Sequence, residues 1–86
     1  MRFGRGDTVD MRCIGAPVSL EHARIECSRG RFILTDQSVN GTYVKPDGEP
    51  LLRLRREQFN LQGNGTIGIG QIPDDEAELT LRYTCI

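Results

Sequence analysis

This sequence has little of what enzymes, metal sites and nucleic-acid binders need. Its 86 residues include no tryptophan, one histidine, and eleven basic against twelve acidic residues, so the net charge is −1. A general nucleic-acid binder would be clearly basic, and the composition argues against that class of function. His22 is the single histidine, whereas a nucleophile with its base and orienting acid needs a positioned histidine or an equivalent group. We therefore expect a protein that is not an enzyme.

Cysteines are also few, and long apolar runs are missing. Cys13, Cys27 and Cys85 cannot all pair within one chain, and their spacing matches no zinc-binding pattern. We expect them to be reduced thiols in a cytoplasmic protein, without a metal or another cofactor. No apolar run approaches the roughly 18 residues of a membrane span, and no segment reads as a signal peptide. The sequence thus predicts no membrane partner.

The dominant pattern is an alternation of apolar and polar residues with a period of two. It recurs in "HARIEC", "RFILTD", "QFNLQ" and "ELTLRYTC", where every second residue is apolar. Such alternation is typical of half-buried strands. The segments "SRGR", "VNG", "PDGE" and "GNG" separate these runs with residues that tolerate positive φ. Short strands between such turns predict an all-β sandwich that occupies residues 1–86 as one domain.

The segment "GNGTIG", Gly63 to Gly68, fits the G-x-G-x-x-G pattern of dinucleotide-binding sites. That pattern must close a strand and open a helix, because the N-terminus of the helix holds the pyrophosphate. Here the chain continues as "IGQIPDD", which contains a proline and no helical periodicity. We expect a hairpin turn that enters a strand.

Charge is unevenly distributed along the chain. Six arginines lie within the first 31 residues, and an acidic cluster lies near the end. The cluster consists of Asp74, Asp75, Glu76 and Glu78. A local cationic pocket is therefore compatible with a net charge near zero.

Three short motifs follow one another along this strand-patterned sequence. They are Gly4-Arg5, then Ser19-x-x-His22, then Asp36-x-Ser38-x-Asn40-Gly41-Thr42. In this order they resemble the forkhead-associated (FHA) family, a β-sandwich of the SMAD/FHA type that binds phosphothreonine peptides through loops at one end. The resemblance runs from about Phe3 to the end of the chain. The sequence also resembles the form fused to bacterial adenylate and guanylate cyclases, which implies a domain of a larger signalling protein.

The resemblance implies which residues would bind a phosphothreonine-containing protein or peptide. Arg5 matches a phosphate-binding arginine, Ser19 matches a phosphate-binding hydroxyl, and the Asn40 amide would bind the peptide backbone. A phosphothreonine brings about −1.5 to −2 charges and three strong acceptor oxygens. A guanidinium suits it, because its donors form a rigid fork and charge-assisted bonds are roughly twice as strong as neutral ones.

The remaining motif residues would shape the loops. By resemblance, Gly4 belongs to the Gly-Arg motif, His22 braces the loops without touching the ligand, and Gly41 lets the chain turn away. A lone histidine is often structural, since its two ring nitrogens can tie two segments together.

Two binding positions depart from the family pattern. Leu20 and Val39 stand where that pattern has polar side chains that help to hold the phosphopeptide. Neither side chain can donate a hydrogen bond, although the two backbone amides remain available. At roughly 1.5–3 kcal/mol for each bond to a charged group, the loss of one or two bonds would weaken binding about tenfold to a thousandfold. Two alternatives stay open: an FHA-like domain that docks a partner or an attached cyclase without phosphate, and a sandwich without a peptide site.

The beginning of the chain is short relative to the family. By resemblance, the first strand and most of the second are missing ahead of Gly4-Arg5. A missing strand exposes a sheet edge that invites pairing. We therefore expect weak homodimerisation through that edge.

Overall fold

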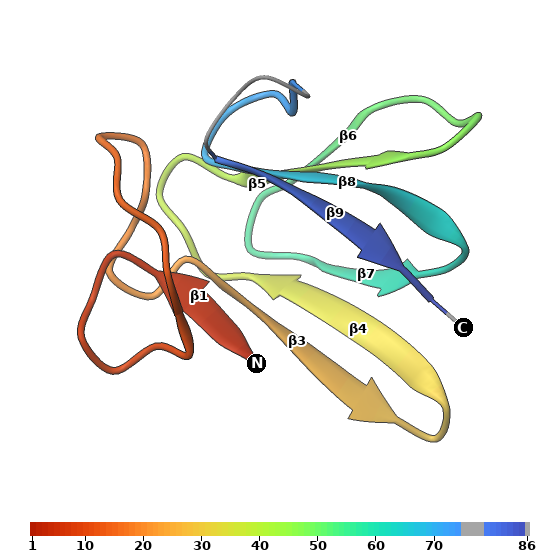
Figure 1. Ribbon diagram of the computed structural model, residues 1–86, viewed down its shortest axis with the longest axis horizontal. Helices are drawn as coiled ribbons and strands as arrows, with labels where there is room; N and C mark the ends of the chain where they lie inside the picture. The colour runs from red at the N-terminus through yellow and green to blue at the C-terminus, as the bar shows by residue number, and fades with distance from the viewer. Residues whose placement is uncertain (75–78, 86) are drawn as a thin grey trace.

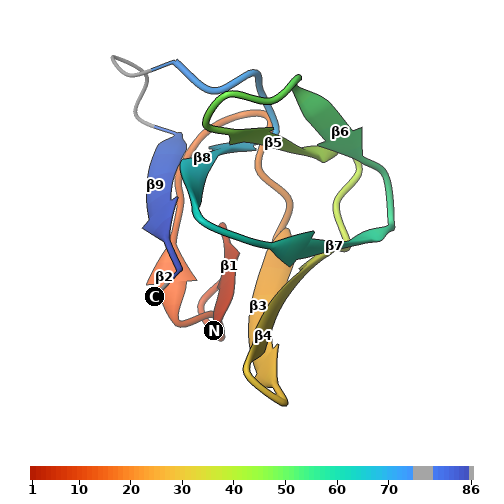
Figure 2. The same cartoon turned by 90° about the vertical axis from the view of Figure 1, so that its right-hand side faces the viewer.

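Two β-sheets face each other in the computed structural model, which describes residues 1–74 and 79–85 (Figures 1 and 2). One sheet consists, in spatial order, of β2 (Met11–Arg12), β1 (Arg2–Gly4), β3 (Ala23–Ser28), β4 (Arg31–Asp36) and β7 (Gln58–Leu61). The other consists of β6 (Leu52–Leu54), β5 (Thr42–Pro46), β8 (Asn64–Ile69) and β9 (Thr80–Thr84). The prediction of an all-β sandwich is confirmed.

All strand pairs in the described sheets are antiparallel except β1 with β2, which are parallel. The β3–β4 hairpin turns at Arg29 and Gly30, whose φ angles are 52° and 75°. Two consecutive positive φ angles characterise the hairpin turn that matches the twist of the flanking strands. The turn predicted from "SRGR" is therefore confirmed.

The "GNG" segment differs from the prediction. Gly63 has a φ of 64° and Asn64 begins β8, so the segment does enter a strand. The predicted hairpin is wrong, however, because β7 and β8 lie in different sheets and β8 pairs with β5 and β9. Turn chemistry identifies where the chain reverses but not which sheet the next strand joins.

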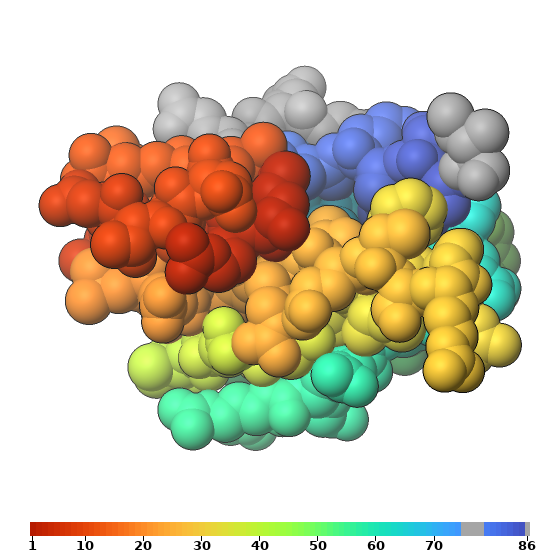
Figure 3. Space-filling model, turned by 90° about the horizontal axis from the view of Figure 1, so that it is seen from below, coloured from red at the N-terminus to blue at the C-terminus, as the bar shows by residue number. Residues whose placement is uncertain are grey.

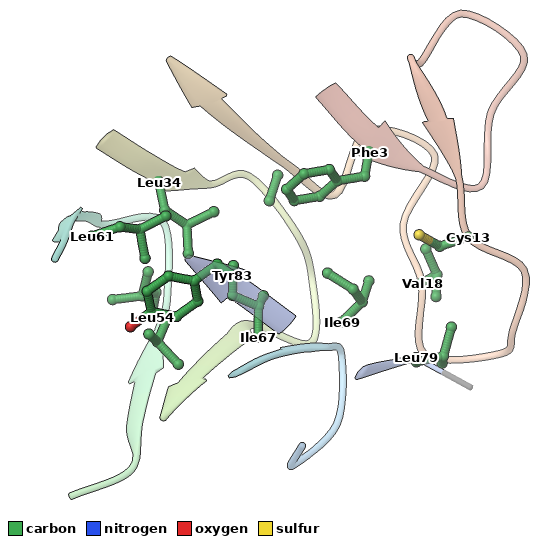
Figure 4. Close-up of a cluster of buried hydrophobic side chains, with 12 residues drawn as sticks. Phe3, Cys13, Val18, Leu34, Leu54, Leu61, Ile67, Ile69, Leu79 and Tyr83 are labelled. Atoms are coloured by element: carbon green, nitrogen blue, oxygen red, sulfur yellow. The ribbon is translucent and has the colours of Figure 1, made fainter. Parts of the chain in front are cut away.

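The core lies between the two sheets (Figure 4). Its largest fully buried apolar side chains are Phe3, Leu34, Val44, Ile67 and Ile69. They come from both sheets and occupy the inward positions of their strands, as the alternation predicts.

Alternation overestimates burial near the β3–β4 turn. Cys27 is exposed and Phe32 is 36% exposed, although both share a predicted face with buried residues. Figure 1 shows this hairpin extending beyond the opposite sheet, so its last inward positions have no facing layer.

Within the described residues, no helix is long and apolar enough to cross a membrane. Asp74 is described, whereas Asp75, Glu76 and Glu78 of the acidic cluster lie outside the described residues.

Several connections meet at one end of the sandwich, on the left of Figure 1. They are the segments around β2, the segment before β3, the β4–β5 loop (37–41) and the β6–β7 loop (55–57). All three motifs from the sequence lie at this end. The β1 strand is flanked on both sides, so the edges of the described sheets are β2, β7, β6 and β9.

Candidate functional site

Gly4 sets the path of the chain into this end of the sandwich. A Cβ at Gly4 would lie 2.2 Å from the carbonyl oxygen of Leu20, which is closer than any side chain permits. The absence of a side chain lets the two backbones approach, and two hydrogen bonds follow. The Arg5 N–H donates to the Ser19 carbonyl at 2.9 Å, and the Gly6 N–H donates to the Leu20 carbonyl at 3.0 Å. Arg5 is thereby fixed beside Ser19.

The Arg5 side chain is anchored at one atom and open at the others. Its Nε donates to the Val18 carbonyl at 3.0 Å. Within residues 1–74 and 79–85, no carboxylate or carbonyl engages its two terminal amino groups. These donors line a groove of about 540 Å³ formed by Arg5, Gly6, Asp7, Thr8, Arg12, Leu20 and Glu21. The anchor orients the guanidinium, and the groove gives an anion access to it.

A second arginine shares this groove. The Arg12 Nε donates to the Arg5 carbonyl at 3.2 Å, and its Nη2 lies 3.6 Å from a carboxylate oxygen of Asp7. The motifs did not identify Arg12, because it reaches the groove through the parallel pairing of β1 with β2. Only the group of six arginines within the first 31 residues of the sequence pointed toward it.

The Ser19 hydroxyl joins two loops. Its Oγ accepts the Val39 N–H at 3.1 Å, across twenty residues of sequence. A hydroxyl that accepts one bond still has its own hydrogen to donate, and an anion in the groove would be a suitable acceptor. The same bond corrects one expectation: the Val39 amide is engaged by Ser19 and is not free to bind a ligand.

His22 is completely buried between these loops. Its Nδ1 accepts the Ser19 N–H at 3.0 Å, and its Nε2 lies 2.8 Å from the Gly41 carbonyl. Nδ1 is the acceptor, so the ring is neutral and Nε2 carries the hydrogen that is donated. Burial lowers the pKa of His22, against the opposing effects of the Gly41 hydrogen bond and the Asp36 charge. The ring thus ties the Ser19 loop to the β4–β5 loop in its uncharged form.

The buried carboxylate of Asp36 holds the β4–β5 loop through hydrogen bonds. One carboxylate oxygen accepts the hydroxyls of Ser38 and Thr42, each at 2.6 Å. The other accepts the backbone N–H of Arg56 at 2.8 Å. The Ser38 Oγ in turn accepts the Gly41 N–H at 2.7 Å. A buried network in which every member has a partner specifies a single loop conformation.

Asn40 is exposed at the tip of this loop. The side-chain Nδ2 of Asn40 donates to the Pro17 carbonyl at 3.0 Å. The backbone carbonyl of Asn40 accepts a hydrogen bond from Nη2 of Arg53 at 2.9 Å. The side-chain oxygen and the second amide hydrogen remain to face a ligand. Gly41 follows with a φ of 93°, a left-handed conformation that glycine adopts without strain.

Leu20 and Val39 project from backbones that other residues hold. Their side chains are 56% and 76% exposed, respectively. Leu20 lines the Arg5 groove, and Val39 lines a second groove on the far side of the β4–β5 loop. Two apolar side chains therefore lie beside the arginines of the two grooves, where they can contact apolar parts of a ligand.

The structure brings together all the residues singled out by the motifs. Gly4, Arg5, Ser19, Leu20, His22, Val39, Asn40 and Gly41 are linked by the contacts above. Figure 3 shows the β4–β5 loop in yellow-green, between the red-orange first twenty residues and the green segment that follows β6. In the part of the chain that the structure describes, no group of three His, Cys, Asp or Glu residues could hold a metal ion.

The comparisons with known proteins agree with this arrangement. A family model described as "FHA domain" matches residues 1–70, which is most of the 86-residue chain. A search of curated proteins found no significant match.

Proposed function

The chain belongs to the FHA domain family, and we propose that it recognises phosphothreonine peptides through Arg5, Ser19 and Asn40. Members of this family are non-catalytic interaction modules that generally bind phosphothreonine. The observation that carries the proposal is the Arg5 guanidinium, which is anchored through Nε with its terminal amino groups open to a groove.

The groove has the donors that a phosphate needs. Arg5 offers a charged fork, and Arg12 adds a second guanidinium to the same wall. Ser19 is bonded to the Arg5 backbone and lies beside the groove, where it offers a hydroxyl hydrogen. Arg12 offsets part of the loss caused by the apolar side chain of Leu20. Asn40 lies on the neighbouring loop, where an amide can pair with the backbone of an extended peptide.

A titration with a degenerate phosphothreonine peptide pool tests this function, with the unphosphorylated pool as control. We expect saturable NMR shifts at Arg5, Ser19 and Asn40 with the phosphorylated pool only. Arg5→Ala should weaken binding at least about tenfold, since it removes bonds to a charged group. Arg31→Ala is the matched control, because it removes the same charge at the end of β4 that is remote from Asp36. Equal binding of both pools, or an unchanged affinity of Arg5→Ala, would contradict the proposal.

A second candidate function is phosphate-independent docking to a partner or to an attached adenylate or guanylate cyclase. The exposure of Leu20 and Val39, at 56% and 76%, favours it, because both occupy positions where a phosphate contact is expected. Binding of this kind would survive phosphatase treatment and Arg5→Ala. It would be weakened in a Leu20→Ser/Val39→Ser variant, whose small uncharged side chains leave phosphate-dependent binding largely intact.

We further propose weak homodimerisation through β9, the longest of the strands at the edges of the described sheets. The bonds from Ile69 N–H to Leu79 and from Cys85 N–H to Gly63 define the pairing with β8. By this register, the backbone groups of Thr80, Arg82 and Thr84 point away from β8. Sedimentation at rising protein concentration should show a dimer, and a monomer at every concentration would refute this proposal.

We also propose that the protein is located in the cytoplasm. Cys13, Cys27 and Cys85 are all free thiols, which supports a reducing, cytoplasmic location. Localisation of a tagged full-length parent protein tests this proposal.

A further inference from the structure

A second cationic groove lies on the other side of the β4–β5 loop. It has a volume of about 200 Å³ and is lined by Ser38, Val39, Gly41, Arg55 and Arg56. The sequence motifs assign no role to either arginine. The loop is thus flanked by arginines on both sides, with Arg5 and Arg12 in the first groove.

The charges in this second groove are not neutralised by neighbouring side chains. Both arginines are exposed, and no carboxylate pairs with either guanidinium among the residues described. The adjacent Glu57 is turned back, because its Oε1 accepts the backbone N–H of Arg55 at 3.1 Å. Two adjacent guanidinium groups repel each other, and an anion between them would relieve that repulsion.

The backbone at Arg56 is fixed by the network that holds the β4–β5 loop. Its φ is 56°, a left-handed conformation that is uncommon for a residue with a side chain. Its N–H donates to Asp36, the carboxylate that also holds Ser38 and Thr42. Both walls of the second groove, Ser38 on the β4–β5 loop and Arg56 on the β6–β7 loop, are therefore held by the same carboxylate.

We propose that Arg55 and Arg56 bind a second anionic side chain, a phosphate or a carboxylate, of the same peptide. This inference rests on the proposed function, because the peptide is held by its phosphothreonine in the Arg5 groove. The β4–β5 loop separates the two grooves, and Asn40 on that loop is placed to guide the peptide backbone across. An extended chain advances about 3.3 Å per residue, so a few residues connect two such sites.

The test is calorimetric titration with four peptide pools. One carries a single phosphothreonine, one adds a phosphoserine, one adds a glutamate, and one is unphosphorylated. The second anion is placed in turn at each position within about five residues on either side. We expect at least one spacing to tighten binding about tenfold, with the phosphoserine stronger than the glutamate because of its greater charge.

Variants identify where the second anion binds. Arg55→Gln/Arg56→Gln should abolish the gain from the second anion and leave the affinity for the singly phosphorylated pool within about twofold. Arg29→Gln/Arg31→Gln is the matched control, because it removes the same charge at the opposite end of β4. Arg29 also shares the left-handed backbone of Arg56, with a φ of 52°, so both double variants test the same strain. Arg56→Gly relieves that strain and supplies a second, well-folded variant.

The outcomes separate this inference from the proposed function. Binding of the singly phosphorylated pool with no gain from a second anion at any spacing would overturn the inference alone. A gain that persists in Arg55→Gln/Arg56→Gln would overturn it as well. Failure of every phosphorylated pool to bind would refute the proposed function, and the inference with it.

Discussion

Replacing His22 with alanine removes the central tie between two loops. The Ser19 N–H loses its acceptor, whereas the Gly41 carbonyl keeps a bond from the Gly70 N–H at 3.1 Å. Each lost bond is worth about 1 kcal/mol, and an unpaired buried donor adds to the cost. Removal of a fully buried ring also leaves a cavity, as in large-to-small core substitutions that cost about 2–5 kcal/mol. We expect His22→Ala to lower the free energy of unfolding by about 3–5 kcal/mol.

This loss is large for a protein of this size. A chain of 86 residues has a total stability of about 4–13 kcal/mol, so the predicted loss removes between about a quarter and all of it. Urea unfolding followed by circular dichroism measures the change, with peptide titration on the folded fraction. His22→Gln is the control, because its amide keeps one acceptor and one donor and should recover about half of the loss. A cost below about 1 kcal/mol for His22→Ala would show that the two bonds and the buried ring do not hold these loops.

Three other predictions concern the supports of the site. Because burial lowers the pKa of His22 below its ordinary value near 6.5, the unfolded chain binds a proton first as the pH falls. The neutral His22 ring therefore contributes fully to the free energy of unfolding above about pH 6.5. Below that pH the free energy of unfolding falls by up to about 1.4 kcal/mol per pH unit, until His22 is also protonated in the folded state. Unfolding curves at several pH values should show this loss in the wild type and not in His22→Gln. Gly4→Ala should cost about 2–3 kcal/mol and weaken phosphopeptide binding, because its Cβ meets the Leu20 carbonyl; an unchanged melting temperature would contradict that contact. Asp36→Asn should lower the free energy of unfolding by about 1–3 kcal/mol, because an amide has one acceptor oxygen and cannot accept every hydrogen bond that Asp36 now accepts, the one from the Arg56 N–H included. Unchanged hydrogen exchange at the Arg56 N–H would argue against the network.

Local sequence patterns predicted the strands and the end of the sandwich where the motifs meet. Alternation identified the inward positions of Leu34, Leu61 and Tyr83, because the period of a strand is fixed by its backbone geometry. The same pattern could not show that Phe32 is 36% exposed, since the burial of a strand position depends on elements far apart in sequence.

The arginines around the site show the same limit. Arg5 was identified because it belongs to a motif, whereas Arg12 and Arg56 reach the grooves through tertiary structure. Arg12 depends on a parallel pair of very short strands, and Arg56 depends on a bond to Asp36 twenty residues away. Long-range contacts of this kind have no periodic signature in the sequence.

Leu20 and Val39 combine a hydrogen-bonded backbone with an exposed side chain. Their backbones are held by Gly6 and Ser19, while their side chains extend into solvent and support nothing in the fold. Surface substitutions at such positions usually change stability by no more than about 0.5 kcal/mol. A combinatorial library at these two positions would therefore vary ligand preference on a constant scaffold, and selection could recover domains with new phosphopeptide specificities.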